Sequence, residues 1–230
     1  MKAVLFDLDD TLYDYVPAHE KALEAVAIKS FSIISTSKEE FLELYSSARK
    51  HFMEELSSLP AYHSRTLYFQ RIIEKKLGKP SAEKSIELYE EYWSVFLANI
   101  KPRVGLIELL SYLKEKKIKV GIATNMTTYA QLKKISALGI STYLDCIVTS
   151  NEVGAEKPRS PIFHIALHKL GTTASETLFV GDDPENDIKG AHKVGMKTVL
   201  IRTPKNSVNA HLVGADYVIK DLLEIKGILG

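Results

Sequence analysis

A short apolar run at residues 3–6 (AVLF) leads directly into the carboxylate-rich segment 7–11 (DLDDT). An apolar run that stops at charged residues is typical of a buried strand in a parallel sheet. The carboxyl ends of such strands form the edge at which open α/β proteins bind ligands. Because side chains alternate along a strand, we expect Asp7 and Asp9 on the same side, a few ångströms apart. Two such anions repel unless a cation or a proton neutralises them, so this edge is a candidate site.

The second half of the chain alternates short apolar runs with amphipathic stretches. This rhythm predicts βαβ units with right-handed crossovers, and therefore an α/β protein with a doubly wound parallel sheet, a Rossmann-like core. The run at residues 3–6 is expected to join that sheet. The other predicted strands are residues 119–124, 146–149, 178–181 and 198–201.

Between the first strand and the rest of the sheet, the sequence predicts only helices. Pro17 suits a first helical turn, and Ser37 with Glu40 has the spacing of a capping box. A break at residues 57–60 precedes a third helix, and Ser81 begins a fourth with Ile86, Tyr89, Trp93 and Phe96 along it. We therefore expect an inserted α-helical domain at residues 15–101, and a catalytic core formed by residues 1–14 and 102–230.

Composition excludes several classes of protein. The 230 residues are 45% hydrophobic and 26% charged, the balance of a globular protein. Lys and Arg total 30 against 29 Asp and Glu, so the formal net charge is only +1 and no strong overall field attracts nucleic acid or anionic lipid. Cys146 is the single cysteine and lies in an apolar run, which predicts a buried structural thiol. With no membrane-spanning run and no signal-peptide pattern, we expect a cytoplasmic protein with neither nucleic-acid nor membrane partners.

Polar residues also follow the other predicted strands. Singly, each is explained equally well as a helix cap or a solvated loop charge; Asp182 or Asp183, for example, could cap the helix that contains Ile188. Together they predict a site, because all strands of a parallel sheet end at one edge. These residues are Thr124 and Asn125 after the second strand, Lys157 after the third, and Asp182, Asp183 and Asp187 after the fourth.

These segments resemble the four motifs of the haloacid dehalogenase-like hydrolases, in order, and the helical insertion resembles the C1 cap of that family. The resemblance implies that Asp7 is a nucleophile that forms an aspartyl-phosphate, and that Asp9 is the general acid and base. It implies that Thr124 and Asn125 bind the phosphoryl group and that Lys157 orients Asp7. The implied cofactor is Mg²⁺, held by Asp7, the backbone carbonyl of Asp9, Asp182 and, in a supporting role, Asp187.

Asp9 favours a phosphatase over the family's dehalogenases and P-type ATPases, which lack an acid at this position. The resemblance implies small phosphorylated substrates such as phosphoglycolate, glyceraldehyde 3-phosphate or a sugar phosphate. Arg65 and His63, in the expected cap loop, are candidates to bind the leaving group, or else are ordinary solvated loop residues. Two alternatives stay open: a phosphomutase acting on a sugar phosphate, and a non-catalytic binding protein with the same fold.

Overall fold

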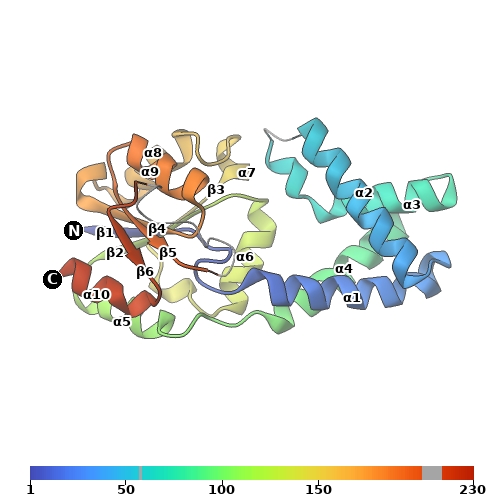
Figure 1. The fold of residues 1–230 in the computed structure, drawn as a ribbon, viewed down its shortest axis with the longest axis horizontal. Helices are drawn as coiled ribbons and strands as arrows, with labels where there is room; N and C mark the ends of the chain where they lie inside the picture. The colour runs from blue at the N-terminus through green and yellow to red at the C-terminus, as the bar shows by residue number, and fades with distance from the viewer. Residues whose placement is uncertain (57–58, 204–213) are drawn as a thin grey trace. The chain divides into compact units, whose positions relative to one another are not determined.

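The computed structural model describes residues 1–56, 59–203 and 214–230. Its described part contains one six-stranded sheet, in the order β3-β2-β1-β4-β5-β6, and all neighbouring strands are parallel. The predicted doubly wound parallel sheet is confirmed (Figure 1). The strands are β1 (Ala3–Phe6), β2 (Lys119–Thr124), β3 (Cys146–Thr149), β4 (Thr177–Gly181), β5 (Lys197–Ile201) and β6 (Tyr217–Ile219).

The order of the strands reverses at β1, which pairs with β2 on one side and with β4 on the other. Every residue of β1 and β4 is buried, which is why both read as continuous apolar runs. Phe6 pairs with Val180, so the chain leaves these two strands at the same level of the sheet. The residues that follow them, Asp7 and Asp182, therefore emerge side by side at the switch point, where open α/β sheets bind ligands.

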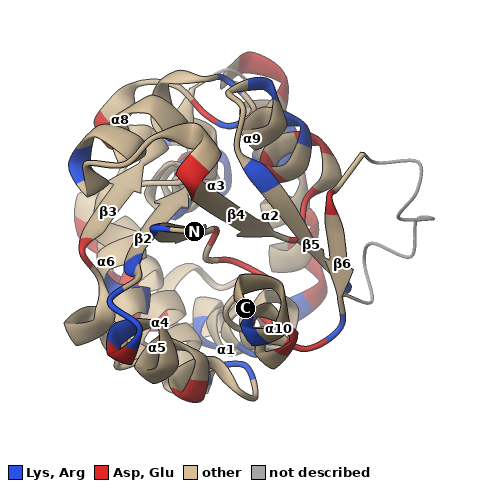
Figure 2. Ribbon diagram, turned by 90° about the vertical axis from the view of Figure 1, so that its left-hand side faces the viewer, with Lys and Arg blue, Asp and Glu red and all other residues tan. Residues whose placement is uncertain are grey.

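Helices cover both faces of this sheet. Figure 2 shows α8 and α9 on one face and α5 and α10 on the other. The α8 face is closed by an apolar cluster that includes Phe163 and Phe179, whose rings meet edge to face at 5.3 Å. Apart from short 3₁₀ turns, the helices that accompany the sheet are α5 (Leu106–Glu115), α6 (Thr128–Ala137), α7 (Ser150–Val153), α8 (Pro161–Leu170), the π-helix η4 (Pro184–Lys189), α9 (Gly190–Lys193) and α10 (Ile225–Leu229).

The chain divides into two compact units: Met1–Asp14 with Lys101–Gly230, and Tyr15–Ile100. The second unit is helical and consists of α1 (Tyr15–Ile34), α2 (Lys38–Leu56), the 3₁₀ turn Pro60–His63, α3 (Arg65–Leu77) and α4 (Ala82–Asn99). The predicted start of α4 is confirmed, since the Ser81 hydroxyl accepts a hydrogen bond from the Lys84 backbone N–H at 3.4 Å. Among the described helices of both units, none combines the length and the apolar character needed to cross a bilayer.

Some local predictions were wrong or incomplete. Ile86, one of the apolar residues named along the fourth helix, is 51% exposed, whereas Leu88 and Tyr92, which were not named there, are buried. Strand β6 was missed because three residues are too few to show a pattern. Two residues of the predicted break at residues 57–60, Ser57 and Ser58, lie outside the described residues. Arg65 was expected in the cap loop, but it is the first residue of α3.

Candidate active site

Asp7 lies directly after β1 and is almost completely buried. Its Oδ1 accepts a hydrogen bond from the Lys157 ammonium at 2.6 Å, and its Oδ2 accepts one from the Thr11 hydroxyl at 3.2 Å. Lys157 is also buried, and its Nζ lies 2.6 Å from Oδ1 of Asp187. Burial alone would lower the pKa of Lys157, but Asp187 and Asp7 outweigh it and raise that pKa. Lys157 is therefore a permanently charged group that fixes one oxygen of Asp7.

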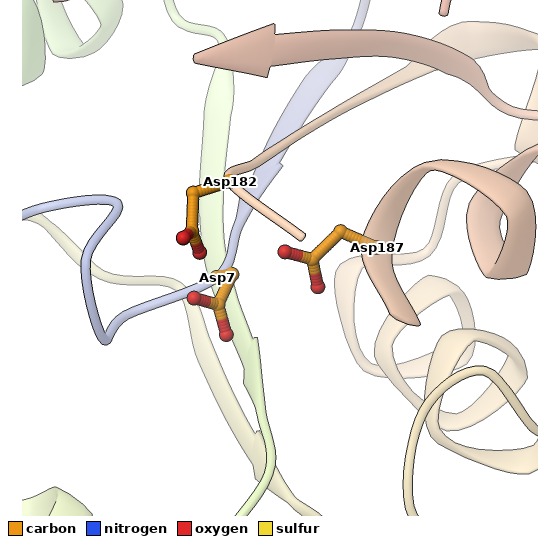
Figure 3. A group of neighbouring side chains, drawn as sticks. All are labelled: Asp7, Asp182 and Asp187. Atoms are coloured by element: carbon orange, nitrogen blue, oxygen red, sulfur yellow. The ribbon is translucent and has the colours of Figure 1, made fainter. Parts of the chain in front are cut away.

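Three carboxyl groups lie close together here, and two of them, Asp7 and Asp187, form ion pairs with this ammonium. Asp7, Asp182 and Asp187 each offer an oxygen, and these oxygens lie within 4.8 Å of one another (Figure 3). Burial raises the pKa of Asp7 to about 7; Lys157 opposes this rise, and Asp187 adds to it. Burial, followed by repulsion from Asp7 and Asp187, raises the pKa of Asp182 to about 9. One ammonium does not balance three carboxylates, so this oxygen-rich cluster suits a divalent cation.

Asp187 reaches the cluster because the segment after β4 is built around it. A Cβ on Gly181 would lie 2.3 Å from Oδ2 of Asp187, so a side chain at position 181 would displace this carboxylate. The same Oδ2 accepts a hydrogen bond from the Asp183 backbone N–H at 3.0 Å. The Asp183 carboxylate itself caps η4, since its Oδ1 accepts hydrogen bonds from the N–H groups of Glu185 and Asn186. The capping interpretation thus holds for Asp183, whereas Asp182 faces the cluster.

Asn125 connects the loop after β2 to the loop that carries Lys157. Its Oδ1 accepts a hydrogen bond from the Lys157 backbone N–H at 2.9 Å, and its Nδ2 donates to the Lys157 carbonyl at 3.3 Å. The Lys157–Pro158 peptide bond in this loop is cis. The structure therefore gives Asn125 a positioning contact that the sequence did not suggest. Its Nδ2 carries a second proton, which is the part of the side chain suited to a phosphate oxygen.

Thr124 ends β2 and is buried. Its hydroxyl accepts a hydrogen bond from Gln131 Nε2 at 2.7 Å and lies 3.3 Å from the Asn125 carbonyl oxygen. Two residues later, Met126 has a φ of 107°, in the region that favours glycine. Its backbone N–H donates to the buried Ser150 hydroxyl at 2.9 Å, which holds this turn in place. Local strain of this kind, held by surrounding contacts, is typical of ligand-binding turns.

The Asp9 side chain has different partners from those of Asp7. Its two oxygens accept hydrogen bonds from the Lys134 ammonium at 2.7 and 2.9 Å, and Tyr13 and Gln131 are further donors to them. Burial alone would raise the pKa of Asp9, but Lys134 and these hydrogen bonds outweigh it and lower that pKa. The carboxylate of Asp9 thus rests against α6. The predicted metal contact of Asp9 concerned its backbone carbonyl, not this side chain.

Gln131 and Lys134 are site residues that the sequence analysis missed. Both are completely buried and lie three positions apart on α6, next to the apolar Ala130 and Ile135. The sequence does contain a signal for them: Gln131 and Lys134 are polar residues on the otherwise apolar face of the helix that follows Thr124 and Asn125. A buried lysine of this kind requires a charged partner, and Asp9 is that partner.

Arg65 and His63 belong to the helical unit. Arg65 is buried, so the solvated-loop interpretation was wrong for it. Its guanidinium donates to Tyr15 Oη at 2.5 Å and to the His63 carbonyl at 3.1 Å, and it lies over the rings of Tyr68 and Tyr92 at 5.2 and 5.5 Å. Within the described residues, the Nε of Arg65 has no hydrogen-bond partner. No carboxylate among these residues forms an ion pair with it.

Known proteins resemble this chain over most of its length. It is 38% identical to a ribulose-1,5-bisphosphate 5-phosphatase of Halopiger xanaduensis, over 89% of this chain and 86% of that protein. It is 32% identical to a glyceraldehyde 3-phosphate phosphatase of Methanocaldococcus jannaschii, over 100% of this chain and 97% of that protein. A crystal structure of a HAD phosphatase from Thermococcus onnurineus superimposes with a TM-score of 0.79 at 30% identity, covering 100% of this chain and 98% of that one.

The family model that matches describes a haloacid dehalogenase-like hydrolase and covers residues 4–201. That span runs from within β1 to the end of β5 and includes Asp7, Thr124, Lys157 and Asp182. The family match and the relatives therefore agree with the carboxylate cluster and the strand order described above. The chain belongs to the haloacid dehalogenase-like hydrolases.

Proposed function

We propose that this protein is a Mg²⁺-dependent phosphatase that hydrolyses small phosphorylated metabolites through an aspartyl-phosphate on Asp7. The observation that carries the proposal is the buried Asp7 carboxylate, held by Lys157 at 2.6 Å beside two further carboxylates. The relatives support the reaction class, since those at 31–38% identity are named as phosphatases of ribulose bisphosphate or glyceraldehyde 3-phosphate. We expect the substrates of this protein to be similar in size and charge to these two metabolites.

In the first step, an oxygen of Asp7 attacks phosphorus in line with the ester bond, an O–P bond forms, and the bond to the leaving alcohol breaks. The negative charge of the bound phosphate opposes the lowering of the Asp9 pKa by Lys134, so Asp9 enters this step protonated and gives that proton to the departing oxygen. In the second step, water attacks the phosphorus of the aspartyl-phosphate while Asp9 takes up its proton. Inorganic phosphate leaves, and the Asp7 carboxylate is restored.

Other residues hold the reacting groups in place. Lys157 orients Asp7 and offsets its charge, and Asn125 positions the backbone of Lys157. Thr124 and the N–H groups that follow it are suited to bind phosphoryl oxygens. Asp7, Asp182 and Asp187, with the Asp9 carbonyl, would hold Mg²⁺, which would offset the negative charge of the phosphoryl group.

Asp7→Asn tests the reaction class. We expect the wild type to release phosphate from at least one member of a panel in Mg²⁺: glyceraldehyde 3-phosphate, ribulose 1,5-bisphosphate, phosphoglycolate and hexose phosphates. Asp7→Asn should reduce that rate at least about 1,000-fold, because the nucleophile is lost. Asp145→Asn is the control, because the exposed Asp145 lies outside the site, where its Oδ2 accepts a hydrogen bond from the Val120 backbone N–H; this variant should retain activity. Interconversion of hexose phosphates without phosphate release would instead indicate a phosphomutase, and no turnover of either kind would indicate a binding protein.

We further propose that the helical unit is a cap and that Arg65 and His63 contact the leaving group. The support is the Arg65 guanidinium, which is buried among tyrosines without a carboxylate partner among the described residues. A buried cation of this kind suits an oxygen-rich or anionic substrate group.

Arg65→Gln should therefore raise KM about 10-fold or more for the preferred metabolite, with a smaller change in kcat. Arg71→Gln is the matched control, because Arg71 lies on the same helix and its guanidinium contacts the Phe52 ring and His51. Steady-state kinetics on the same panel make the comparison. Equal kinetics for Arg65→Gln and wild type on every substrate would contradict this role.

A further inference from the structure

We propose that Lys134 is a positioning residue for the phosphatase reaction, which acts by fixing the Asp9 carboxylate; this inference rests on the function proposed above. Lys134 is completely buried on α6, far along the chain from Asp9. Its Nζ lies 2.7 Å from Oδ1 and 2.9 Å from Oδ2 of Asp9. One ammonium therefore holds both oxygens of the proposed acid and base.

The burial of Lys134 shows that this contact is more than a surface ion pair. Removing an ammonium from water is unfavourable unless a charged partner compensates, so an apolar residue would be the simpler choice for packing alone. The Asp9 side chain, by contrast, is 27% exposed. The pair thus joins a buried cation to a carboxylate that solvent, and hence a substrate, can reach.

Two further donors complete the arrangement around Asp9. Tyr13 Oη donates to Oδ1, and Gln131 Nε2 lies 3.1 Å from Oδ2. The same Nε2 lies 2.7 Å from the Thr124 hydroxyl and 2.9 Å from the Asn125 carbonyl oxygen. Asp9 is therefore tied, through Gln131, to the turn proposed to bind the phosphoryl group.

This arrangement fixes a side chain that the backbone alone would leave free to rotate. Asp9 follows the end of β1 and has only two rotatable side-chain bonds, so the donors on its oxygens decide where they lie. A general acid must be within hydrogen-bond reach of the leaving oxygen, and a misplacement of about 1 Å can reduce a rate about 100-fold. Removing the Lys134 ammonium should therefore impair the steps that use Asp9, and those alone.

The test compares kcat/KM for phenyl phosphate and 4-nitrophenyl phosphate, which differ little in shape. Phenolate requires protonation as it leaves, whereas 4-nitrophenolate requires little. Because kcat/KM covers only the steps up to formation of the aspartyl-phosphate, the comparison isolates the acid role of Asp9. For Lys134→Met we expect a loss of about 10- to 100-fold with phenyl phosphate and a loss several-fold smaller with 4-nitrophenyl phosphate. Lys134→Arg, which keeps the charge and the donors, should recover part of the loss.

A double-mutant cycle with Asp9→Asn separates positioning from a purely structural effect. If Lys134 acts through Asp9, Lys134→Met should cause little further loss with phenyl phosphate in the Asp9→Asn background. Lys133→Met is the matched control: Lys133 is the neighbouring residue on α6, lies over the Tyr129 ring and should leave both rates unchanged. Circular dichroism checks that each variant is folded; if Lys134→Met is not, Lys134→Gln takes its place in every comparison.

Equal losses on the two esters, wild-type rates, or full additivity with Asp9→Asn would each overturn the proposal. These results are distinct from a failure of the proposed function, in which the wild type itself would release no phosphate from any ester in Mg²⁺.

Discussion

Gly181 shows how a single hydrogen atom in place of a side chain shapes the site. A methyl group at this position would collide with the Asp187 carboxylate, at 2.3 Å from its nearest oxygen. We expect Gly181→Ala to displace Asp187 from Lys157, to lower kcat/KM at least about 10-fold, and to destabilise the fold by about 1–3 kcal/mol. Phosphate release and urea denaturation measure the two effects.

Gly227→Ala is the matched control for this change. Gly227 lies in α10, and among the described residues no atom beyond its chain neighbours and its own helix backbone lies within 4 Å of the position that its Cβ would take. Because alanine favours helix over glycine, this variant should be as stable as the wild type or slightly more stable, with unchanged activity. If Gly181→Ala behaved in the same way, the close fit between Gly181 and Asp187 would be unimportant for the site.

Cys146 lies at the start of β3 and is buried, as the sequence predicted. Burial raises the pKa of its thiol to about 11. At about pH 8, roughly one molecule in 1,000 then carries the thiolate, against about one in four for an ordinary cysteine, so the folded thiol should react at least about 100-fold more slowly. Labelling with a disulfide reagent, with and without denaturant, measures this difference. Rapid labelling of the folded protein would show that the thiol is accessible.

At the level of the element, the start of η4 depends on Asp183. Its carboxylate accepts hydrogen bonds from two backbone N–H groups and from the Asn186 side chain at 2.8 Å. Asp183→Ala should destabilise the protein by about 1 kcal/mol, because those N–H groups lose their cap. Asp183→Ser keeps a capping oxygen and should recover most of this loss. Urea denaturation provides the comparison; equal stability of the alanine variant and wild type would contradict the capping role.

The elements themselves were largely predictable because each predicted strand is buried on both faces and so reads as an apolar run. Strands β1, β2 and β3 begin and end where they were predicted, and β4 and β5 begin one residue earlier. The buried residues of α4 were less predictable, since apolar residues occur on more than one side of this helix: Ile86 is exposed, whereas Leu88 and Tyr92 are buried. Among the described strands, β6 pairs with β5 alone, and it has three residues, too few to show periodicity.

The partners of the site residues were less predictable than the elements. Asp7, Lys157 and Asp182 could be placed at one edge because strand polarity alone determines where they emerge. The contact between Asp9 and Lys134 depends instead on where α6 packs against the loop after β1, which no local pattern records. The sequence analysis placed Asp7 and Asp9 on one side of a strand, but β1 already ends at Phe6, so the alternation of side chains along a strand does not extend to them. It therefore did not reveal that Asp7 pairs with Lys157 and Asp9 with Lys134.

Considered as a whole, the molecule has an uneven balance of buried charge. In the core, Lys157 forms ion pairs with Asp7 and Asp187, and a carboxylate oxygen of Asp182 lies within 4.8 Å of both of these carboxyl groups. In the helical unit, the buried Arg65 forms no ion pair with a described carboxylate. Among the described residues, a cation would therefore offset the charge of the carboxyl cluster in the core, and an anionic substrate group would offset that of the buried Arg65 guanidinium.

The excess negative charge in the core predicts how pH changes stabilisation by Mg²⁺. Without metal, the pKa of Asp7 is raised to about 7 and that of Asp182 to about 9, so both bind protons more tightly in the folded than in the unfolded chain. The contribution of these two groups to the stability of the metal-free protein should therefore fall as pH rises from about 4 to about 9, as their protons are lost. Mg²⁺ competes with the same protons and should stabilise more at high pH.

We expect Mg²⁺ to raise Tm, relative to protein in chelator, by at least about 3 °C more at about pH 8.5 than at about pH 6. Taking the difference at each pH cancels the titration of groups that the metal does not touch. Asp182→Asn removes the carboxyl with the higher of the two pKa values and should reduce both the dependence on pH and the effect of Mg²⁺. A Tm increase that is the same at both pH values, or that survives unchanged in Asp182→Asn, would show that Mg²⁺ binds elsewhere. Stabilisation that grows with pH and depends on Asp182 would place the metal among the three carboxylates.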